Sequence, residues 1–185
     1  MNRYIETPLT KEVTASLNVG DYVYISGKIY TARDAAHERI YKALHKNEEI
    51  PIDLENNIIY YMGPTPAREK NVIGSAGPTT ASRMDKYTPD LLRLGLKGMI
   101  GKGKRSKEVV DGIIKNQAIY FAAVGGAGAF LAGKIKKSKI IAYDDLGTEA
   151  IRELEVDNFP VIVVIDTQGN NLYEMAAKEY CTLEK

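Results

Sequence analysis

The alternation of apolar and polar residues predicts an extended strand near the N-terminus, followed by a helix. Residues 21–30 (DYVYISGKIY) alternate and are rich in β-branched and aromatic side chains, which is typical of a half-buried strand. Thr31 then has the character of a helix N-cap, with Asp34 three residues later as in a capping box. Apolar residues recur at helical spacing after Asp34, so the pattern predicts a helix that runs to about Lys46.

Short apolar runs predict further strands along the rest of the chain. The shorter candidates are residues 57–62, 71–76 and 98–101. Three further runs are apolar on both faces, as buried parallel strands tend to be: residues 118–124, 139–144 and 160–166. Helices are predicted from Thr88, with Pro89 at its first position, from Ser106 as an N-cap to about Asn116, and over residues 172–180.

The order of these elements indicates an α/β fold. Strands alternate with helices after residue 70, which favours a mostly parallel central sheet covered by helices. The first 65 residues are rich in strands and predict an additional β layer packed against that sheet. No repeat or Pro/Ser-rich linker divides the sequence, so we expect one domain over residues 1–185.

Composition narrows the classes of partner. The 185 residues are 44% hydrophobic and 26% charged, which is typical of a globular domain. Twenty-five Lys and Arg oppose 24 Asp and Glu, and a net charge of +1 lacks the excess of a general nucleic-acid or membrane-surface binder. We therefore expect neither partner, and any recognition of anions must be local.

The single cysteine, Cys181, and the lack of a long apolar segment bear on the compartment. One cysteine rules out a disulfide framework within the chain and fits a reducing compartment, and Cys181 itself is interpreted as a small buried hydrophobic residue. Residues 1–13 are interrupted by charges, unlike a signal peptide. The longest run without a charged or amide side chain, residues 118–133, is shorter than the roughly 20 residues of a membrane-spanning helix. We expect a soluble, cytoplasmic protein.

Three cationic side chains next to predicted helix starts and strand ends are candidates for binding carboxylates. Arg33 falls about two residues inside the first long helix, Arg83 follows Thr79 by one turn so that the two would share a helix face, and Lys102 follows a strand. Residues 77–82 (GPTTAS) place three hydroxyls and no bulk around a helix start, as expected where backbone approaches a small polar ligand. The alternative for each cation is a solvated surface charge.

The remaining motifs are weaker indications of function. Residues 124–133 (VGGAGAFLAG) partly match a dinucleotide fingerprint, with Asp144 and Asp145 after the next strand, but Leu131 stands where the third glycine belongs. Tight packing of strand and helix beside the site is the favoured interpretation. The lysines that follow are interpreted as hydrated charges that complement a helix end: Lys134, Lys136, Lys137 and Lys139. His37 and His45 lie in no metal-ligand motif, so we predict no metal ligands.

Three segments together resemble the β subunit of the two-subunit iron-sulfur hydro-lyases, the class I fumarase and L(+)-tartrate dehydratase family. They are residues 31–37 (TARDAAH), 77–85 (GPTTASRMD) and 99–106 (MIGKGKRS); residues 124–133 and 143–147 also fit. The resemblance covers nearly the whole chain and implies a domain of the swivelling β/β/α type. It also implies that the family reaction, the reversible addition of water across a double bond flanked by two carboxylates, takes place here.

The resemblance assigns roles to residues already singled out by their chemistry. It makes Arg33, Thr79, Arg83 and Lys102 substrate-binding residues, with Thr79 and Arg83 as the catalytic pair. The residues expected to support them without touching substrate are Asp34, His37 and Thr80. A dicarboxylate needs positive charge at both ends, which two arginines and a lysine provide.

The role of Thr79 stays open between two alternatives. A threonine hydroxyl is a weak base unless a neighbour takes its proton or a positive field stabilises its alkoxide. Thr79 either transfers a proton in the field of Arg83 and Lys102, or hydrogen-bonds the substrate while an acid or base comes from the partner.

The resemblance also implies a [4Fe-4S] cluster, which one cysteine cannot hold because such clusters are bound by several thiolates. We expect the cluster on a separate α subunit, and hence a hetero-oligomer in which this chain contributes the dicarboxylate-binding side. A homo-oligomer is the alternative for the isolated chain. Fumarate hydration to L-malate is the expected reaction, because it is the more widespread activity of the family. The alternatives are an L(+)-tartrate dehydratase β subunit, a non-catalytic nucleotide-binding module using the Gly125–Gly133 loop, and a purely structural subunit.

Overall fold

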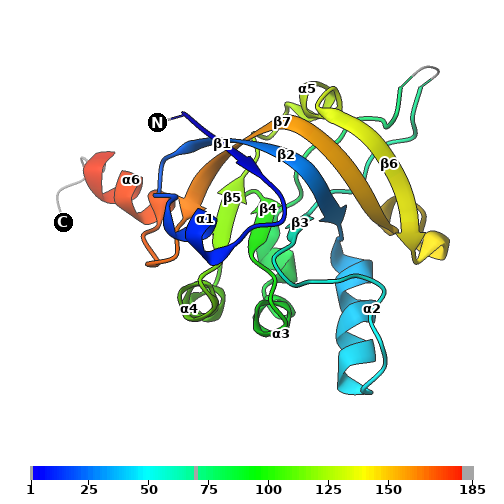
Figure 1. The fold of residues 1–185 in the computed structure, drawn as a ribbon, viewed down its shortest axis with the longest axis horizontal. Coiled ribbons are helices and arrows are strands. Elements are labelled where there is room, and N and C mark those ends of the chain that lie inside the picture. Colours follow the sequence, from blue (N-terminus) through cyan, green and yellow to red (C-terminus); the bar gives the residue numbers. More distant parts are fainter. Residues whose placement is uncertain (1, 69–70, 181–185) are drawn as a thin grey trace.

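The computed structural model describes residues 2–68 and 71–180 and contains one mixed sheet with helices along it (Figure 1). The strands are β1 (Asn2–Glu6), β2 (Tyr22–Thr31), β3 (Ile58–Tyr60), β4 (Gly98–Gly101), β5 (Ile119–Ala122), β6 (Ile135–Ala142) and β7 (Ile151–Ile165). The α-helices are α1 (Lys11–Ala15), α2 (Asp34–His45), α3 (Thr88–Arg93), α4 (Lys107–Asn116), α5 (Gly128–Ala132) and α6 (Leu172–Tyr180), and two short 3₁₀ helices are η1 (Ala81–Met84) and η2 (Asp144–Glu149).

The sheet is parallel where the chain alternates between strands and helices. β1 to β5 pair in parallel in their order along the chain, which confirms the expected parallel centre. β7 is antiparallel to β2, β5 and β6. Because β7 pairs with both β2 and β5, the strands β2, β3, β4, β5 and β7 form a closed hydrogen-bonded circuit, with β1 and β6 attached to it.

The prediction that residues 139–144 and 160–166 are parallel strands is wrong in direction. Residues 160–165 are the last part of β7, a 15-residue strand, and this part runs antiparallel to both β2 and β5. A strand in the middle of a sheet is buried on both faces whichever way it runs, so its apolar run does not reveal its direction. β6 lies at the edge and pairs antiparallel with β7.

The lysines expected to cluster at a helix end lie instead mainly on this edge strand. Lys137 pairs with Glu155 at 2.7 Å and Lys136 with Asp157 at 3.7 Å, both across the β6–β7 ladder. Charged side chains of this kind discourage pairing of an edge strand with another chain.

Three local predictions are also wrong. The strand-rich N-terminal part forms no separate layer, since β1 and β2 join the same seven-stranded sheet. Thr31 does not cap α2, because it ends β2 and its Oγ1 accepts a hydrogen bond from the backbone N–H of Arg152 at 3.1 Å. Residues 71–76 form a loop rather than a strand. In that loop Ser75 N–H is satisfied by the Thr65 hydroxyl at 2.8 Å rather than by a neighbouring strand.

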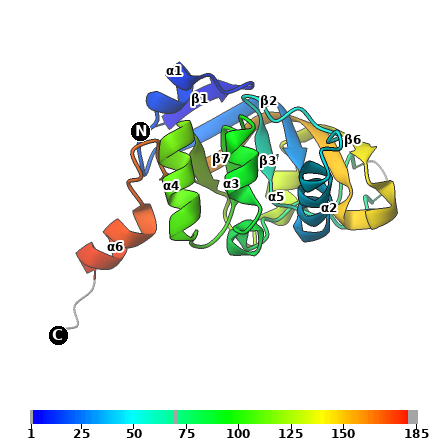
Figure 2. The same ribbon diagram turned by 90° about the horizontal axis from the view of Figure 1, so that it is seen from below.

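The two faces of the sheet carry separate apolar cores. Alternate residues of β3 point to opposite faces, so Ile58 and Tyr60 join one core while Ile59 and Tyr61 join the other. The second core is covered by α2, α3 and α4, which lie side by side along that face (Figure 2). Their starts agree with the sequence: Pro89 lies in the first turn of α3, and the Ser106 hydroxyl accepts from Val109 N–H at the start of α4.

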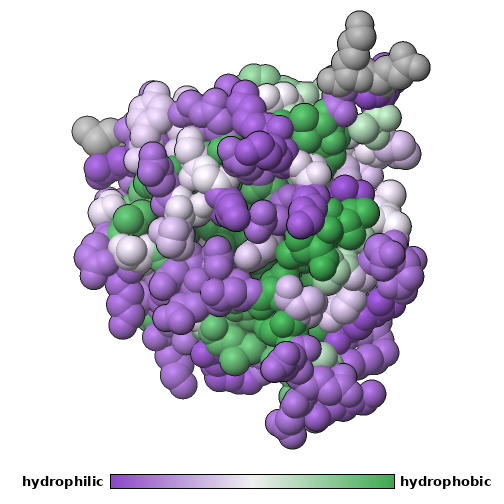
Figure 3. All heavy atoms as spheres, turned by 45° about the vertical axis from the view of Figure 1, so that its right-hand side comes forward, coloured by the Kyte–Doolittle hydropathy of each residue, from purple (hydrophilic) through white to green (hydrophobic). Residues whose placement is uncertain are grey.

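The molecular surface is mostly hydrophilic, with apolar side chains gathered in patches between the charged ones on the face shown in Figure 3. Val124 and Phe130, in the glycine-rich segment, are both largely exposed. Over residues 2–68 and 71–180, no helix combines the length and apolar character needed to cross a membrane. Cys181 lies outside the described residues, so the prediction that it is buried stays a prediction.

Candidate active site

The carboxyl ends of the parallel strands β2, β3, β4 and β5 meet at one edge of the sheet, where α/β proteins commonly bind ligands. Three loops and the start of α2 gather there. Thr79 N–H donates to the carbonyl of Tyr61 at 2.7 Å, and Ala81 N–H donates to the carbonyl of Lys102 at 2.8 Å. The loops after β3 and β4 are thereby held together by their backbones.

Arg33 and Arg83 are brought together by one carboxylate. Asp34 Oδ1 lies 2.7 Å from Arg83 Nε, and Asp34 Oδ2 lies 3.5 Å from a terminal nitrogen of Arg33. The Arg33 side chain is mostly buried, whereas the Arg83 side chain is 52% exposed. Asp34 therefore contacts both cations directly, which is compatible with the supporting role expected for it, and that role stays a prediction. Asp34, the first residue of α2, thus holds Arg83 of η1 and Arg33 of the α2 N-cap in one cluster.

Arg33 lies at the N-cap of α2 rather than two residues inside it, and Glu149 completes its surroundings. One Glu149 oxygen accepts from Ala35 N–H at 2.8 Å, and the other lies 3.3 Å from Arg33. The carboxylate thus occupies the helix N-terminus and balances the charge of Arg33. Glu149 was missed by the sequence reasoning, because it is 114 positions from Ala35 and lies in no helix-capping pattern.

Thr79, Thr80 and Lys102 form the second part of the site. Thr80 and Lys102 make an isolated parallel bridge, and Lys102 N–H donates to the carbonyl of Thr79 at 3.3 Å. Lys102 is exposed and Thr79 is half-buried. Thr79 and Arg83 do not share a helix face, because η1 begins only at Ala81 and has the tighter 3₁₀ winding.

The glycine-rich segment packs against these loops, as the sequence favoured. Ala76 N–H donates to the carbonyl of Gly128 at 3.0 Å. A Cβ on Gly128 would overlap the Ser75 hydroxyl and lie 3.0 Å from the backbone nitrogen of Gly77, so a larger residue would force these segments to shift. Gly125 lies close to the stem of Lys102, since a Cβ there would be 3.9 Å from Lys102 Cδ. The loop after β5 therefore borders the site.

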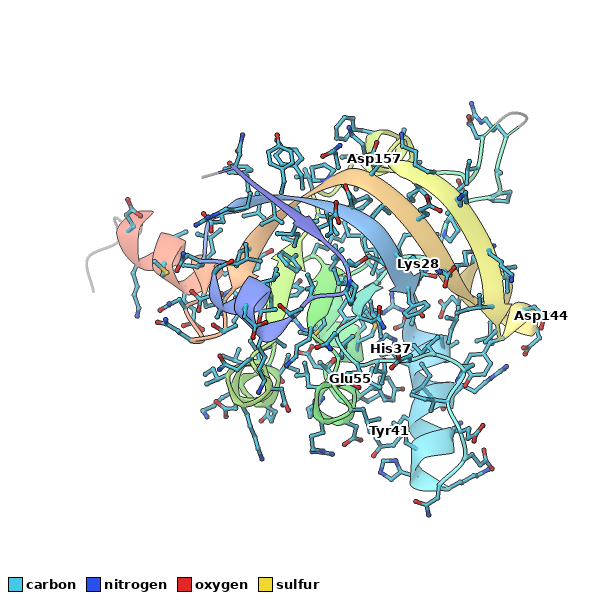
Figure 4. The ribbon with its side chains drawn as sticks, viewed as in Figure 1. Lys28, His37, Tyr41, Glu55, Asp144 and Asp157 are labelled. Carbon is cyan, nitrogen blue, oxygen red and sulfur yellow. The ribbon has the colours of Figure 1, made fainter. Side chains whose placement is uncertain are left out.

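The two aspartates that would complete a dinucleotide site lie elsewhere. Asp144 is at the far end of β6 from α5 (Figure 4). Eight residues of strand separate the two ends, or about 26 Å at the usual rise. Asp145 forms a bidentate ion pair with Arg39 at 2.7 and 2.8 Å. The structure does not bring these carboxylates to the glycine-rich loop.

His37 lies four positions after Arg33, on the buried side of α2 (Figure 4). It is fully buried, and its Nδ1 is 2.9 Å from the carbonyl of Arg33. Its ring meets Tyr61 edge-on with centroids 5.4 Å apart. Burial lowers the pKa of His37 to about 4, so the ring is neutral at pH 7.

The lowered pKa of His37 predicts a loss of stability in mild acid. Below pH 6.5 the unfolded state takes up a proton that the folded state takes up only near pH 4, so the unfolding free energy should fall over that window by about 3 kcal/mol. Urea denaturation at pH 7, 5 and 4 measures this. His37→Phe, which cannot titrate, should lose less stability than the wild type, and equal losses in the two proteins would refute the assignment.

No group of three or more His, Cys, Asp or Glu side chains within residues 2–68 and 71–180 is arranged to hold a metal ion. The whole chain contains one cysteine. The residues present therefore do not fit an iron-sulfur cluster, whose irons are held by several thiolates.

Comparisons with known proteins show the family that this sequence resembles. Residues 2–176 match the family model described as Fumarase C-terminus. A protein of Methanocaldococcus jannaschii, named provisionally as an L(+)-tartrate dehydratase subunit beta, is 41% identical over 182 residues, which are 95% of this chain and 93% of that protein. The aerobic class I fumarate hydratase of Escherichia coli is 36% identical over 177 residues, and fumarate hydratase 2 of Leishmania major is 39% identical over 158.

The extent of these matches differs between the two kinds of relative. The alignment covers 93% of this chain but only 32% of the E. coli enzyme, and 84% of this chain but 28% of the L. major enzyme. The chain thus spans about a third of the length of these fumarate hydratases and nearly all of the M. jannaschii subunit. Since the family model matches almost the entire sequence, the chain belongs to the Fumarase C-terminus family.

Proposed function

We propose that this chain is the β subunit of a two-subunit hydro-lyase and supplies the residues that hold a dicarboxylate substrate. The observation that carries the proposal is that Asp34 joins Arg33 to Arg83, while Thr79, four positions before Arg83, is bonded through its backbone to Lys102, all at the carboxyl ends of β2 to β4. Relatives named as fumarate hydratases and a tartrate dehydratase subunit support it.

The charges suit a substrate with two carboxylates. Arg83 uses its Nε for Asp34, which leaves its terminal nitrogens for an incoming carboxylate, and planar guanidinium groups bind carboxylates in a bidentate manner. Lys102, on the neighbouring loop, supplies a point charge for the other end. Arg33 is held by Asp34 and Glu149, which balance its charge, and it anchors the carboxylate that orients Arg83.

The chemistry assigned to this chain is binding and proton transfer. In malate dehydration a proton leaves the carbon next to one carboxylate while hydroxide leaves the adjacent carbon, and the double bond forms between them. Within the described residues no side chain accepts a hydrogen bond from the Thr79 hydroxyl. Thr79 is therefore free to face substrate, either to take the proton in the field of Arg83 and Lys102 or to hydrogen-bond the substrate.

A second subunit completes the site in this proposal. Arg83 and Lys102 are exposed at the surface, and the fumarate hydratase relatives contain this domain as about a third of a longer chain. The family's [4Fe-4S] cluster, which acts on the substrate hydroxyl, then belongs to that α subunit, because this chain has one cysteine.

Fumarate is the proposed substrate, and L(+)-tartrate is the alternative that a specific observation favours. Of the relatives described above, the tartrate dehydratase subunit has the higher identity and matches over nearly its whole length. Malate and tartrate differ by one hydroxyl, and Arg83 and Lys102 would bind their carboxylates alike. Discrimination requires a group that pairs with that hydroxyl.

The proposal is tested by assaying this chain alone, the cluster-bearing candidate partner alone, and the pair reconstituted without oxygen. We expect a folded but inactive single chain, and activity only in the pair. Rates with fumarate and with tartrate decide between the substrates. Turnover by the pure chain without iron would contradict the shared site, and failure of the two chains to associate would favour the binding module or another role.

Glu149→Gln should raise KM for the dicarboxylate with little change in kcat. The glutamine oxygen can still accept from Ala35 N–H, but this turns its NH₂ group toward Arg33, which loses an ion-pair partner. We expect roughly a fivefold increase in KM, since a partly exposed ion pair contributes about 1 kcal/mol. Steady-state kinetics of the assembled enzyme measure it. A lower KM would mean that Glu149 competes with substrate for Arg33.

A further inference from the structure

Arg105 is a buried cation that lies behind the candidate site and that the proposed reaction does not use. Its side chain is fully buried, and its Nε lies 2.6 Å from Asp85 Oδ1. One terminal nitrogen donates to the Thr88 hydroxyl at 2.8 Å. The guanidinium also lies over the rings of Tyr61 and Tyr120, 5.3 and 4.9 Å from their centroids.

These contacts reach the loops that carry the site residues. Asp85 follows η1 directly and lies two positions after Arg83. The Thr88 hydroxyl donates to the carbonyl of Met84 at 2.9 Å, so Arg105 is connected to both ends of the turn that follows Arg83. Arg105 itself lies three positions after Lys102.

Tyr61 links the network to Thr79. Arg105 donates to the Tyr61 hydroxyl at 3.4 Å, and the carbonyl of Tyr61 accepts from Thr79 N–H. The second oxygen of Asp85 accepts from Ser106 N–H at 2.6 Å, at the start of α4. A single carboxylate therefore joins the end of η1 to the end of the Lys102 loop, with Arg105 between them.

The geometry of the guanidinium matters more here than its charge. A planar group with a fixed fork can bind Asp85, Thr88 and Tyr61 at once, whereas an ammonium group is a point charge on a flexible stem. A buried charge that loses part of its partners is costly, so each partner is held in place. The arrangement constrains the backbone positions from which Thr79, Arg83 and Lys102 project.

We propose that Arg105, through Asp85, is a positioning residue that sets the relative placement of Arg83, Thr79 and Lys102 without touching substrate. The inference rests on the proposed function for its kinetic consequence. Its structural consequence, the coupling of residues 79–85 to residues 102–106, does not depend on activity.

The test is Arg105→Lys in the assembled enzyme, together with hydrogen exchange of the variant chain. We expect kcat to fall by about ten- to a hundredfold, because misplacement of catalytic groups by about 1 Å has effects of this size. Amide exchange should become faster in residues 79–85 and 102–106, and should be unchanged in β1 and β6. Asp85→Asn, which retains an oxygen for Ser106 N–H, is the second variant and should show the same pattern if Arg105→Lys does not fold.

Lys97→Met is the matched control. Lys97 is also a buried cation, and its Nζ donates to the carbonyl of Asn116 at 2.5 Å, but it precedes β4 and so lies at the opposite end of that strand from the site. Lys97→Met should lower the melting temperature but should not lower kcat as Arg105→Lys does. If Arg105→Lys loses no more activity than Lys97→Met at equal loss of stability, the positioning role is wrong.

The two proposals fail in different ways. Wild-type kcat and unchanged exchange in Arg105→Lys would overturn the positioning role and leave the proposed function standing. If the wild-type pair hydrates neither fumarate nor tartrate, the proposed function fails, while local exchange in residues 79–85 and 102–106 still decides whether Arg105 couples the two loops.

Discussion

Arg83→Ala should lower turnover of the assembled enzyme by about a hundredfold or more, the size of effect seen when a preorganised charge that stabilises a transition state is removed. Arg83 is 52% exposed and anchored by Asp34 at 2.7 Å, so it presents a fixed guanidinium to the open side of the site. Alanine removes that charge and leaves Asp34 without its closest partner. Steady-state kinetics with fumarate and with tartrate measure the effect.

Lys86→Met is the control for Arg83. Lys86 is an exposed cation three positions along the chain, and it lies over the ring of Tyr87 with its Nζ 4.6 Å from the centroid. Its replacement should leave kcat and KM close to wild type. Arg83→Lys should recover part of the activity, since the charge remains but bidentate binding is lost. Near-normal turnover of Arg83→Ala would show that this chain is a purely structural subunit.

Thr79→Val should lower kcat by about a hundredfold or more if the Thr79 hydroxyl transfers a proton, because valine has the same shape and no ionisable group. Thr79→Ser keeps a hydroxyl and should retain most of the activity. The backbone of Thr79 is held by Tyr61 and Lys102, so neither substitution should move the loop.

The two roles left open for Thr79 give different results. Exchange of the substrate C–H proton with deuterated solvent reports proton transfer separately from turnover. If Thr79 moves the proton, Thr79→Val loses this exchange along with kcat. If Thr79 only hydrogen-bonds the substrate, the exchange persists and the main change is a higher KM. Unchanged kcat and KM in Thr79→Val would exclude both roles.

Local features of the fold were predictable because their causes lie within a few residues. The alternation over residues 21–30 produced β2, and the starts of α3 and α4 follow from Pro89 and from the Ser106 hydroxyl. A cap or a strand pattern depends on its neighbours in the chain, so the sequence carries it. The same local reasoning was wrong at Thr31, whose hydroxyl accepts a hydrogen bond from the backbone N–H of Arg152, a residue of the distant strand β7.

The sequence pointed to the residue types of the candidate site, but it did not predict which of these residues form ion pairs with one another. The sequence alone made Arg33, Arg83 and Lys102 candidates for binding carboxylates, with Thr79 beside them, and showed that one cysteine cannot hold a cluster. Their proposed roles came from the family resemblance and stay predictions until the variants are measured.

Only the tertiary structure determined which strands and which charged residues pair with each other. Three features depend on segments that are far apart in the chain. They are the antiparallel direction of β7, the pairing of Glu149 with Arg33, and the burial of Arg105 against Asp85. The apolar pattern of a strand does not show whether the strand runs parallel or antiparallel to its neighbours. A charged residue in the sequence does not show which opposite charge it will pair with. Closure of β2, β3, β4, β5 and β7 into one circuit brings these residues together, and only then is each ion pair determined.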